Sequence, residues 1–179
     1  MNIIGHFKTI TSHKLLVMKF CFQAGLYKQG LLHDLSKYTP SEFFIGARYY
    51  QGNKSPNDAE RQDIGYSSAW MHHKGRNKHH YEYWIDYQLG APKGTMGPVP
   101  MPARYIAEMF CDRIAACIIY NKENYDPQMA LDYYLKGKGT TMIHPETGRL
   151  LEGLLRMYVK YGEKKTLRYI RKVFLKKYS

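Results

Sequence analysis

Apolar residues recur at three- and four-residue spacing along almost the whole chain, which is the period of an amphipathic α-helix. Near the N-terminus, Ile10, Met18 and Phe22 follow this spacing, and Gly25 is placed to end the helix. No stretch alternates between apolar and polar residues over the length of a strand. We therefore predict an all-α fold, a single compact multi-helix domain over residues 1–179. Further helices are expected over residues 26–37, 58–73, 79–88, 103–122, 126–135, 145–161 and 163–177.

Turn residues separate these predicted helices. A helix start is predicted over residues 39–42, where Thr39 can cap the helix, Pro40 suits its first position and Glu42 can reach back to the amide of the cap. Residues 89–102 contain four prolines and three glycines, which excludes a helix. This segment is expected to form either a wall over a site or an ordered crossing of the surface.

The charge of the chain is strongly basic and unevenly distributed. Its 27 Lys and Arg residues against 15 Asp and Glu residues give a net charge of +12. Residues 149–179 contain ten basic and two acidic residues, so this segment carries +8 and the rest of the chain carries +4. Such a balance favours polyanionic partners such as nucleic acid, nucleotides or an anionic membrane surface. The alternative is a solvated helical face whose Lys and Arg stems cover apolar surface.

Composition excludes several classes of protein. With 44% hydrophobic and 23% charged residues, the chain has the balance of a folded domain and not that of a disordered segment. Its uncharged stretches are shorter than the ~20 apolar residues of a membrane-spanning helix, and the apolar run 15–22 lacks the cleavage site of a signal peptide. Three scattered cysteines are too few for a disulfide framework. We therefore expect a cytoplasmic protein without a membrane span.

The residues that can carry chemistry are histidines and aspartates spread along the chain. Imidazole and carboxylate groups suit Mn, Fe, Ni and Zn ions, and a binuclear site also needs a carboxylate that can bridge. Asp34 follows His33 directly and can supply such an oxygen. Asp112 lies in a largely apolar predicted helix, where a carboxylate is costly unless it is paired or bound to a cation. The candidate metal ligands are His13, His33, Asp34, His72, His73, His79, His80 and Asp112.

The histidine doublets at 72–73 and 79–80 form the second half of this set. They lie seven residues apart, a spacing that shares one face of a continuous helix. Gly75 and Asn77 interrupt that continuity. We therefore expect one member of each doublet to be a ligand, and its neighbour to bond substrate or backbone.

A resemblance to a known family is carried by the segment Gly30-Leu-Leu-His-Asp-Leu-Ser-Lys37, which resembles the HD motif of the HD superfamily of metal-dependent phosphohydrolases. The order His, His-Asp, His, His, Asp resembles that of its binuclear members. Met71-His-His-Lys74 is similar to the paired histidines of the HD-GYP branch, whose Gly-Tyr-Pro element is missing here. The chain also looks like a small family of bacterial and phage HD-like proteins that share an Asn-x-His-His-x-Glu stretch, here Asn77 to Glu82.

This resemblance implies a fold, a metal centre and an activity. It implies an HD-like helical domain whose first divalent ion is held by His13, His33, Asp34 and Asp112. Asp34 would bridge to a second ion, held by one member of each later doublet. The implied activity is hydrolysis of a nucleotide or another small phosphate ester by a mono- or binuclear centre.

Residues beside the candidate ligands suit a role toward an anionic substrate. Lys37 lies one turn after Asp34, and the resemblance implies that it acts on the substrate or on the attacking water; the alternative is a lysine that complements a helix dipole. Glu108 precedes Asp112 by one turn and is expected either to orient a ligand histidine or to form a plain salt bridge. The candidate catalytic residues are Asp34 and Lys37, and the candidate substrate-binding residues are Lys74, Arg76, Lys78 and Arg113.

Two other functions are consistent with the same residues. The first is a di-iron oxygenase of HD fold, which uses the same types of ligand. The second is a nucleic-acid-binding protein that uses the basic C-terminal helices and holds only a structural metal. The second function predicts steeply salt-dependent binding that is lost when residues 149–179 are deleted.

Overall fold

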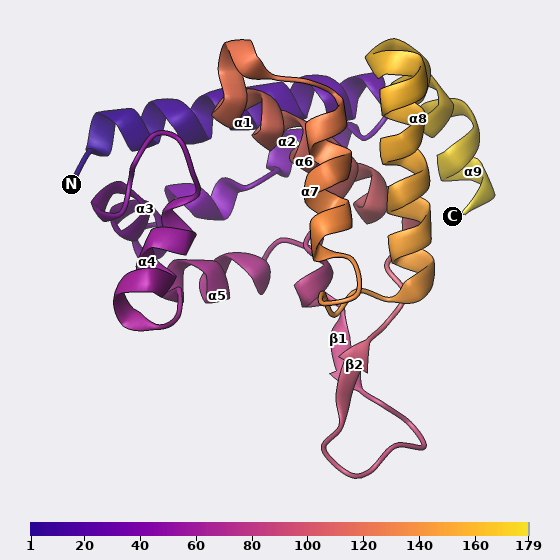
Figure 1. The fold of residues 1–179 in the computed structure, drawn as a ribbon, viewed down its shortest axis with the longest axis horizontal. Helices are drawn as coiled ribbons and strands as arrows, with labels where there is room; N and C mark the ends of the chain where they lie inside the picture. The colour runs from indigo at the N-terminus through magenta and orange to yellow at the C-terminus, as the bar shows by residue number, and fades with distance from the viewer. Residues whose placement is uncertain (179) are drawn as a thin grey trace.

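A computed structural model shows a predominantly helical molecule, as the apolar spacing predicts (Figure 1). The structure describes residues 1–178. No helix within this range is long and apolar enough to cross a membrane. The longer helices are α1 (Ile3–Gln23), α2 (Tyr27–Leu32), α3 (Pro40–Arg48), α4 (Pro56–Ile64), α5 (Ser68–Lys74), α6 (Ala103–Asn121), α7 (Gln128–Gly137) and α8 (Pro145–Tyr169). The shorter elements are the 3-10 helices η1 (Leu35–Tyr38), η2 (Tyr81–Tyr83) and η3 (Lys122–Asn124), the strands β1 (Ile85–Tyr87) and β2 (Met96–Pro98), the π-helical turn η4 (Ile170–Phe174) and the final turn α9 (Leu175–Lys177).

Helix α6 lies at the centre of the apolar core. It packs against α1, α7 and α8. Phe110 and Ile114 of α6 are fully buried, together with Phe20 of α1 and Leu151 and Leu155 of α8. Burial on several sides explains why α6 is apolar around most of its circumference. Any acidic side chain of α6 that faces inward therefore needs a partner.

The helices between α1 and α6 form a separate lobe beside this core. In Figure 1, α3, α4 and α5 lie on the left and α7 and α8 on the right, while α1 extends along both. Helix α3 packs against α1 and α5, which ties the lobe to the N-terminal half of α1. Seven of the eight histidines come from α1, from this lobe and from the connection to the small sheet, whereas His144 caps α8.

Two predicted breaks in the helical pattern are confirmed, and both are glycines. Gly25 follows the end of α1 with a φ of 83°, and Gly162 interrupts α8 with a φ of 76°. Both values lie in the left-handed region, which glycine enters without the steric cost that a Cβ brings. At Gly25 space also matters, because a Cβ there would lie 3.1 Å from Cγ of Arg171.

The helix predicted over residues 58–73 is in fact two helices. Gly65 ends α4 with a φ of 84°, and its amide donates to the carbonyl oxygen of Arg61 at 2.9 Å. Ser67 then begins α5, because its hydroxyl oxygen accepts a hydrogen bond from the amide of Trp70. The interruption is so short that the apolar spacing carries across it, and the sequence pattern therefore missed it.

The helix predicted over residues 79–88 is also wrong. After η2 the chain forms β1, which pairs in antiparallel fashion with β2, with Ile85 opposite Pro98 and Tyr87 opposite Met96. The glycine-rich segment at 89–102 is therefore not a plain linker, because it turns the chain back and supplies the second strand. This hairpin projects away from the helices at the bottom of Figure 1.

Helix α3 begins at Pro40, as predicted, but the predicted capping box does not form. The hydroxyl group of Thr39 donates to the carbonyl oxygen of Ser36 at 2.6 Å, and its side chain makes no cap hydrogen bond. The Glu42 carboxylate turns toward α5 and is buried there. Partners on another helix thus replace the local partner that the sequence indicates.

Candidate metal centre

The His33-Asp34 pair lies where α2 ends and η1 begins, and not within one helical turn as we expected. Asp34 has a φ of 54° and a ψ of 26°, a left-handed conformation that aspartate tolerates better than most residues. Lys14 supports this break, because its ammonium group donates to the carbonyl oxygens of Leu31 and His33, both at 2.8 Å. The side chains of His33 and Asp34 both turn into the molecule, where each residue is only 2% exposed.

The first group of potential ligands joins α1, this break and α6. His13 Nε2 lies 2.9 Å from Oδ1 of Asp112, and His33 Nε2 lies 3.6 Å from the same oxygen. Oδ2 of Asp34 lies 3.4 Å from His33 Nε2 and 3.9 Å from His13 Nε2. Ligand atoms of all four residues lie within 4.8 Å of one another. The structure therefore brings together the four side chains that the resemblance assigns to one ion.

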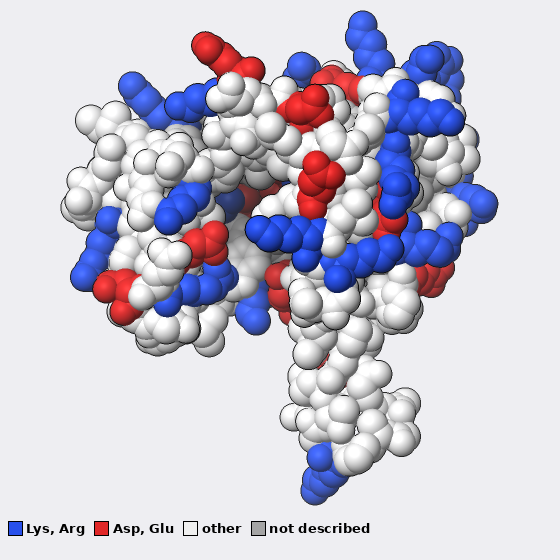
Figure 2. Space-filling model, viewed as in Figure 1, with Lys and Arg blue, Asp and Glu red and all other residues white. Residues whose placement is uncertain are grey.

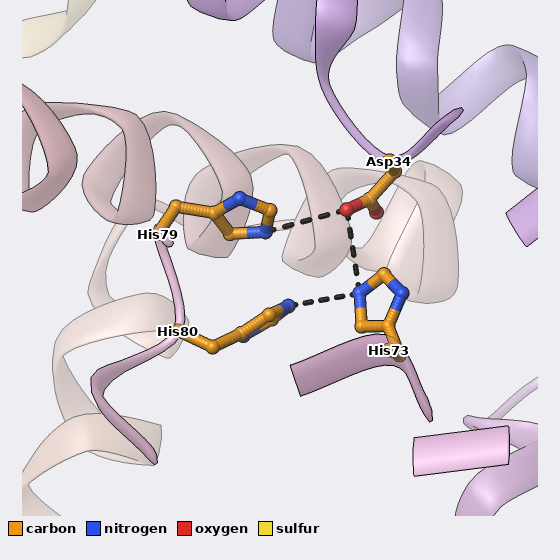
Figure 3. A group of neighbouring side chains, drawn as sticks. All are labelled: Asp34, His73, His79 and His80. Atoms are coloured by element: carbon orange, nitrogen blue, oxygen red, sulfur yellow. Dashed lines mark hydrogen bonds and ion pairs between the residues drawn. The ribbon is translucent and has the colours of Figure 1, made fainter. Parts of the chain in front are cut away.

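The second group uses the other oxygen of Asp34 (Figure 3). Asp34 Oδ1 lies 3.3 Å from Nε2 of His73 and 3.3 Å from Nε2 of His79. His80 Nε2 lies 2.9 Å from His73 Nε2. His79 and His80 therefore both face the centre, which differs from the expectation of one ligand from each doublet. They lie in a non-helical connection, so neighbouring side chains are not forced onto different faces.

Asp34 connects the two groups, and its surroundings fit a cation. Its two oxygens face different sets of imidazole nitrogens, the arrangement expected of a bridging carboxylate. Buried atoms without a hydrogen bond among the described residues include Oδ1 of Asp34 and Nε2 of His33 and of His79, and Oδ2 of Asp34 is paired only with the ammonium group of Lys37 outside the ligand groups. Buried polar atoms are almost always partnered, and nitrogen and carboxylate oxygen are the donors that Mn, Fe, Ni and Zn accept. These groups could hold a metal ion.

Glu108 of α6 holds two of the imidazole rings from behind. Its Oε1 accepts hydrogen bonds from Nδ1 of His33 at 3.0 Å and from Nδ1 of His79 at 3.2 Å. A proton on Nδ1 leaves the lone pair of Nε2 free, and in both rings Nε2 is the atom nearest Asp34. Of the two roles expected for Glu108, the contacts match the orienting one.

Glu42 holds a third ring in the same way. It accepts from His73 Nδ1 at 2.8 Å and from His72 Nδ1 at 2.5 Å. Nε2 of His72 pairs with the hydroxyl of Ser41, so the structure does not bring His72 into either ligand group. Burial alone would raise the pKa of Glu42, but hydrogen bonds from His73 and His72 lower it overall. Glu42 thus serves as an ionised partner of His73.

The two aspartates of the centre are ionised. Burial would raise the pKa of Asp34, but His33, Lys37 and His73 outweigh burial and hold this pKa well below its ordinary range. For Asp112, burial is outweighed in the same direction by His13 and His33. Two fixed negative charges in a region shielded from water favour the binding of a cation.

Neutral imidazole is favoured at two positions. Burial is the largest cause that lowers the pKa of His80 well below its ordinary value, and the charges of His79 and His73 add to it. Burial also lowers the pKa of His13, although its hydrogen bond to Asp112 acts in the opposite direction. Neutral imidazole is the form that binds a metal, so these rings lose no proton on binding one.

Lys37 lies beside Asp34, as the spacing predicts. Its Nζ is 2.6 Å from Oδ2 of Asp34. Burial would lower the pKa of Lys37, but the charges of Asp34 and Asp112 raise it above its ordinary value, so the ammonium group stays charged. This is the only cation of the predicted set that the described residues place against the centre.

Three of the four predicted substrate-binding cations make contacts elsewhere. Arg76 donates to the carbonyl oxygen of His72, and the ammonium group of Lys78 lies over the ring of Tyr83. Arg113 lies over the ring of Tyr133, on the side of α7. Among the described residues, no hydrogen bond or ion pair joins the side chain of Lys74, Arg76, Lys78 or Arg113 to the two ligand groups.

A cavity that the sequence did not indicate opens beside Lys37 and His73. It has a volume of about 70 Å³, and Figure 2 shows the surface hollowed between the lobe of α3 to α5 and helix α7. His6 forms part of its wall. His6 precedes His13 by seven residues on α1, so the two rings share one face of that helix, and this spacing was the available signal.

Comparison with known proteins gives one family. A family model described as a family of unknown function, DUF5662, matches residues 2–157. The chain belongs to this family. Neither curated proteins nor solved structures provide a match. The matched region contains both ligand groups and ends within the basic segment 149–179, so the family model covers the candidate metal centre but not residues 158–179.

Proposed function

We propose that this DUF5662 protein is a metal-dependent phosphohydrolase that acts on a nucleotide or another small phosphate ester. One observation carries the proposal: Asp34 offers one oxygen to each of two groups of buried ligand side chains, and outside these groups only the Lys37 ammonium group is paired with either oxygen among the described residues. A bridging carboxylate between two histidine-rich groups is the arrangement that binuclear hydrolytic centres need. The HD resemblance of residues 30–37 adds independent support.

Two sets of residues would hold the ions. One set is His13, His33, Asp34 and Asp112, and the other is Asp34, His73, His79 and His80. When bound, divalent ions lower the pKa of a water molecule and stabilise the charge of a phosphoryl group. Side chains around these sets orient the ligands and bind the substrate.

Three charged side chains surround the ligands. Glu108 and Glu42 fix the orientation of three imidazole rings through their Nδ1 atoms, so the Nε2 atoms stay directed at Asp34. Lys37 carries a positive charge next to Asp34 and can neutralise an oxygen of a phosphoryl group. A cation in this position supports an anionic substrate more than an uncharged one.

The test is an Asp34→Ala variant compared with the wild-type protein. We expect wild-type protein purified without chelators to contain divalent metal and to hydrolyse phosphate esters when manganese is added. Asp34→Ala should lose both the metal and the activity while circular dichroism shows an unchanged helical fold. Retention of stoichiometric metal and of activity in Asp34→Ala would refute the proposal.

The histidine-rich donor set also supports a second candidate, a di-iron oxygenase, because the same ligand types bind iron. Protein purified without oxygen and loaded with iron would then show the spectroscopic signature of a mixed-valent iron pair. Activity with manganese in the absence of oxygen would count against this candidate.

A further inference from the structure

The cavity beside Lys37 is in direct contact with the candidate metal centre. Lys37, Glu42 and His73 line it, and these residues also contact the ligand groups. Its other polar walls come from three helices and the loop before α4. They are His6 and Thr9 of α1, Tyr50, Ser55 and Asn57 around the start of α4, and Tyr120 of α6.

His6 is an unpartnered polar group in this wall. The residue is only 6% exposed. Its ring packs against the rings of Phe43 and Tyr50, with centroids 5.4 and 6.1 Å away, but its nitrogens make no hydrogen bond within the described residues. Both ring nitrogens remain accessible from the cavity, where an imidazole can donate to or accept from a hydroxyl group.

Gly46 makes room for this imidazole. A Cβ on Gly46 would overlap Cε1 and Nε2 of the His6 ring. The backbone of α3 thus comes close enough to hold the ring in place at the cavity wall. The position of His6 is therefore built by its neighbours and is not that of a freely moving side chain.

The remaining polar walls suit hydroxyl groups. The hydroxyls of Thr9 and Tyr50 form a pair at 2.8 Å, and each has further hydrogen-bonding capacity. The Asn57 amide is half-buried and makes no side-chain hydrogen bond within the described residues. Imidazole, amide and hydroxyl groups both donate and accept, which matches the hydroxyls of a polyol.

The size of the cavity limits what can enter it. A water molecule needs roughly 10–15 Å³ measured in the same way, so about 70 Å³ provides five to seven water-sized positions. This is enough for a polyol fragment of a few carbons and its hydroxyl groups. A nucleoside, with a fused base and a ribose ring, is larger than this space.

We propose that this cavity binds the alcohol part of a small polyhydroxylated phosphate ester, held by His6, Asn57 and the Thr9–Tyr50 pair while the phosphoryl group lies against Lys37. The assignment rests on the proposed phosphohydrolase function and narrows its substrate class from phosphate esters in general to those of small polyols. Under this assignment a nucleotide is a poor substrate.

The test uses the full chain loaded with manganese, and three probes: glycerol 3-phosphate, a nucleoside monophosphate and inorganic phosphate. The wild type should hydrolyse glycerol 3-phosphate with a kcat/KM at least about tenfold above that of the nucleoside monophosphate. Asn57→Ala and His6→Phe, which keeps a ring but removes its nitrogens, should raise KM for glycerol 3-phosphate about tenfold. Both should leave the inhibition constant of inorganic phosphate unchanged. Asn53→Ala, a matched change in the exposed loop before α4, should leave all these values at the wild-type level.

Each other outcome is decisive. A nucleoside monophosphate that is hydrolysed as well as glycerol 3-phosphate, or a KM that neither variant raises, overturns the cavity assignment but leaves the phosphohydrolase proposal intact. If no ester is hydrolysed, the phosphohydrolase proposal fails. A calorimetric titration with glycerol 3-phosphate then decides the cavity: binding weakened by Asn57→Ala but not by Asn53→Ala supports the assignment, and absence of binding overturns it.

Discussion

The candidate metal centre and the basic C-terminal surface are both dense in ionisable groups, but they are built in opposite ways. In the centre, side chains from α1, α5, α6 and two connections converge, and nearly all of them are buried. On the C-terminal surface, Lys164, Arg168, Arg171 and Lys172 line a shallow groove together with Gln23, and all four cations are exposed. Figure 2 shows many Lys and Arg side chains over the region of α8.

This difference in burial shows which charged groups indicate a binding site. Exposed cations on one helix are solvated and screened by salt, so they need no ligand to be stable. Oδ1 of Asp34 and Nε2 of His33 are different, because folding removes them from water without giving them a hydrogen bond. A high density of charge along the sequence therefore says less than unpartnered atoms that meet inside the fold.

The largest expected effect tests the role of the C-terminal segment in folding. Phe174 is 2% exposed and belongs to the core. Phe174→Ala should lower the free energy of unfolding by about 3–5 kcal/mol, since it leaves a large cavity. Lys172→Ala, two residues earlier on the exposed face, should change it by less than about 0.5 kcal/mol. Chemical denaturation measures the free energy of unfolding of both variants. Equal losses in the two variants would show that Phe174 does not belong to the core in the way described.

This core role corrects an experiment that the sequence alone indicates. Deletion of residues 149–179 would remove Leu151, Leu155 and Phe174 from the core together with the cations. Loss of nucleic-acid binding after that deletion would therefore report unfolding. Substitution of exposed cations avoids this problem.

The next largest effect is a loss of metal affinity when Glu108, which orients two imidazole rings, is changed. Glu108→Gln keeps the shape of the side chain but weakens its hold on Nδ1 of His33 and His79. We expect the affinity for manganese to fall about 10- to 100-fold, as is typical when the partner of a ligand histidine is changed. Calorimetric titration measures this, with Glu123→Gln, in the exposed η3 turn, as control. Equal affinities for Glu108→Gln and wild type would show that Glu108 does not act through the metal ligands.

A smaller effect, on binding to DNA, is expected when the four groove cations are replaced together by alanine. We expect the wild-type protein to associate only weakly with duplex DNA at low salt. In the variant, the slope of log affinity against log salt should fall by up to about 3.6. Metal content should not change. Binding that survives about 0.2 M salt, or that disappears in Asp34→Ala, would contradict the separation of the two regions.

The smallest effect comes from a buried acid that has its own donors. Glu60 accepts hydrogen bonds from the hydroxyls of Ser67 and Ser68. Burial would raise its pKa, but these bonds lower it below the ordinary 4.5. The stabilisation is therefore present above pH 4.5 and is lost as the pH falls through the lowered value. Glu60→Gln should flatten the acid side of the curve of stability against pH and leave metal content unchanged. Loss of metal would contradict this.

Much of the helical framework follows from the sequence, because its causes are local. The apolar spacing of α1 and α6 and the glycines at 25 and 162 act within a few residues of themselves. The small sheet was missed because its strands are three residues long and meet only through pairing with each other. Short strands of this kind give too few positions for a period to show.

The ligand set of the centre was indicated by residue type, but its details depend on contacts between distant segments. The left-handed turn at Asp34 could not be expected, because its break is supported from α1 by Lys14. Glu42 meets His72 and His73 across thirty residues of sequence, so a local capping role was the only visible one. His79 and His80 both reach the second ligand group because they lie in an irregular connection. The spacing of apolar residues predicts helices and strands, but it does not predict the path of such a connection.

The most direct test of the metal centre is anomalous X-ray scattering from crystals of the full chain loaded with manganese. We predict anomalous peaks within coordination distance of Asp34, one on the side of His13 and Asp112 and one on the side of His73 and His79. Absence of anomalous density around Asp34 at saturating manganese, in crystals where these side chains are well ordered, would contradict it.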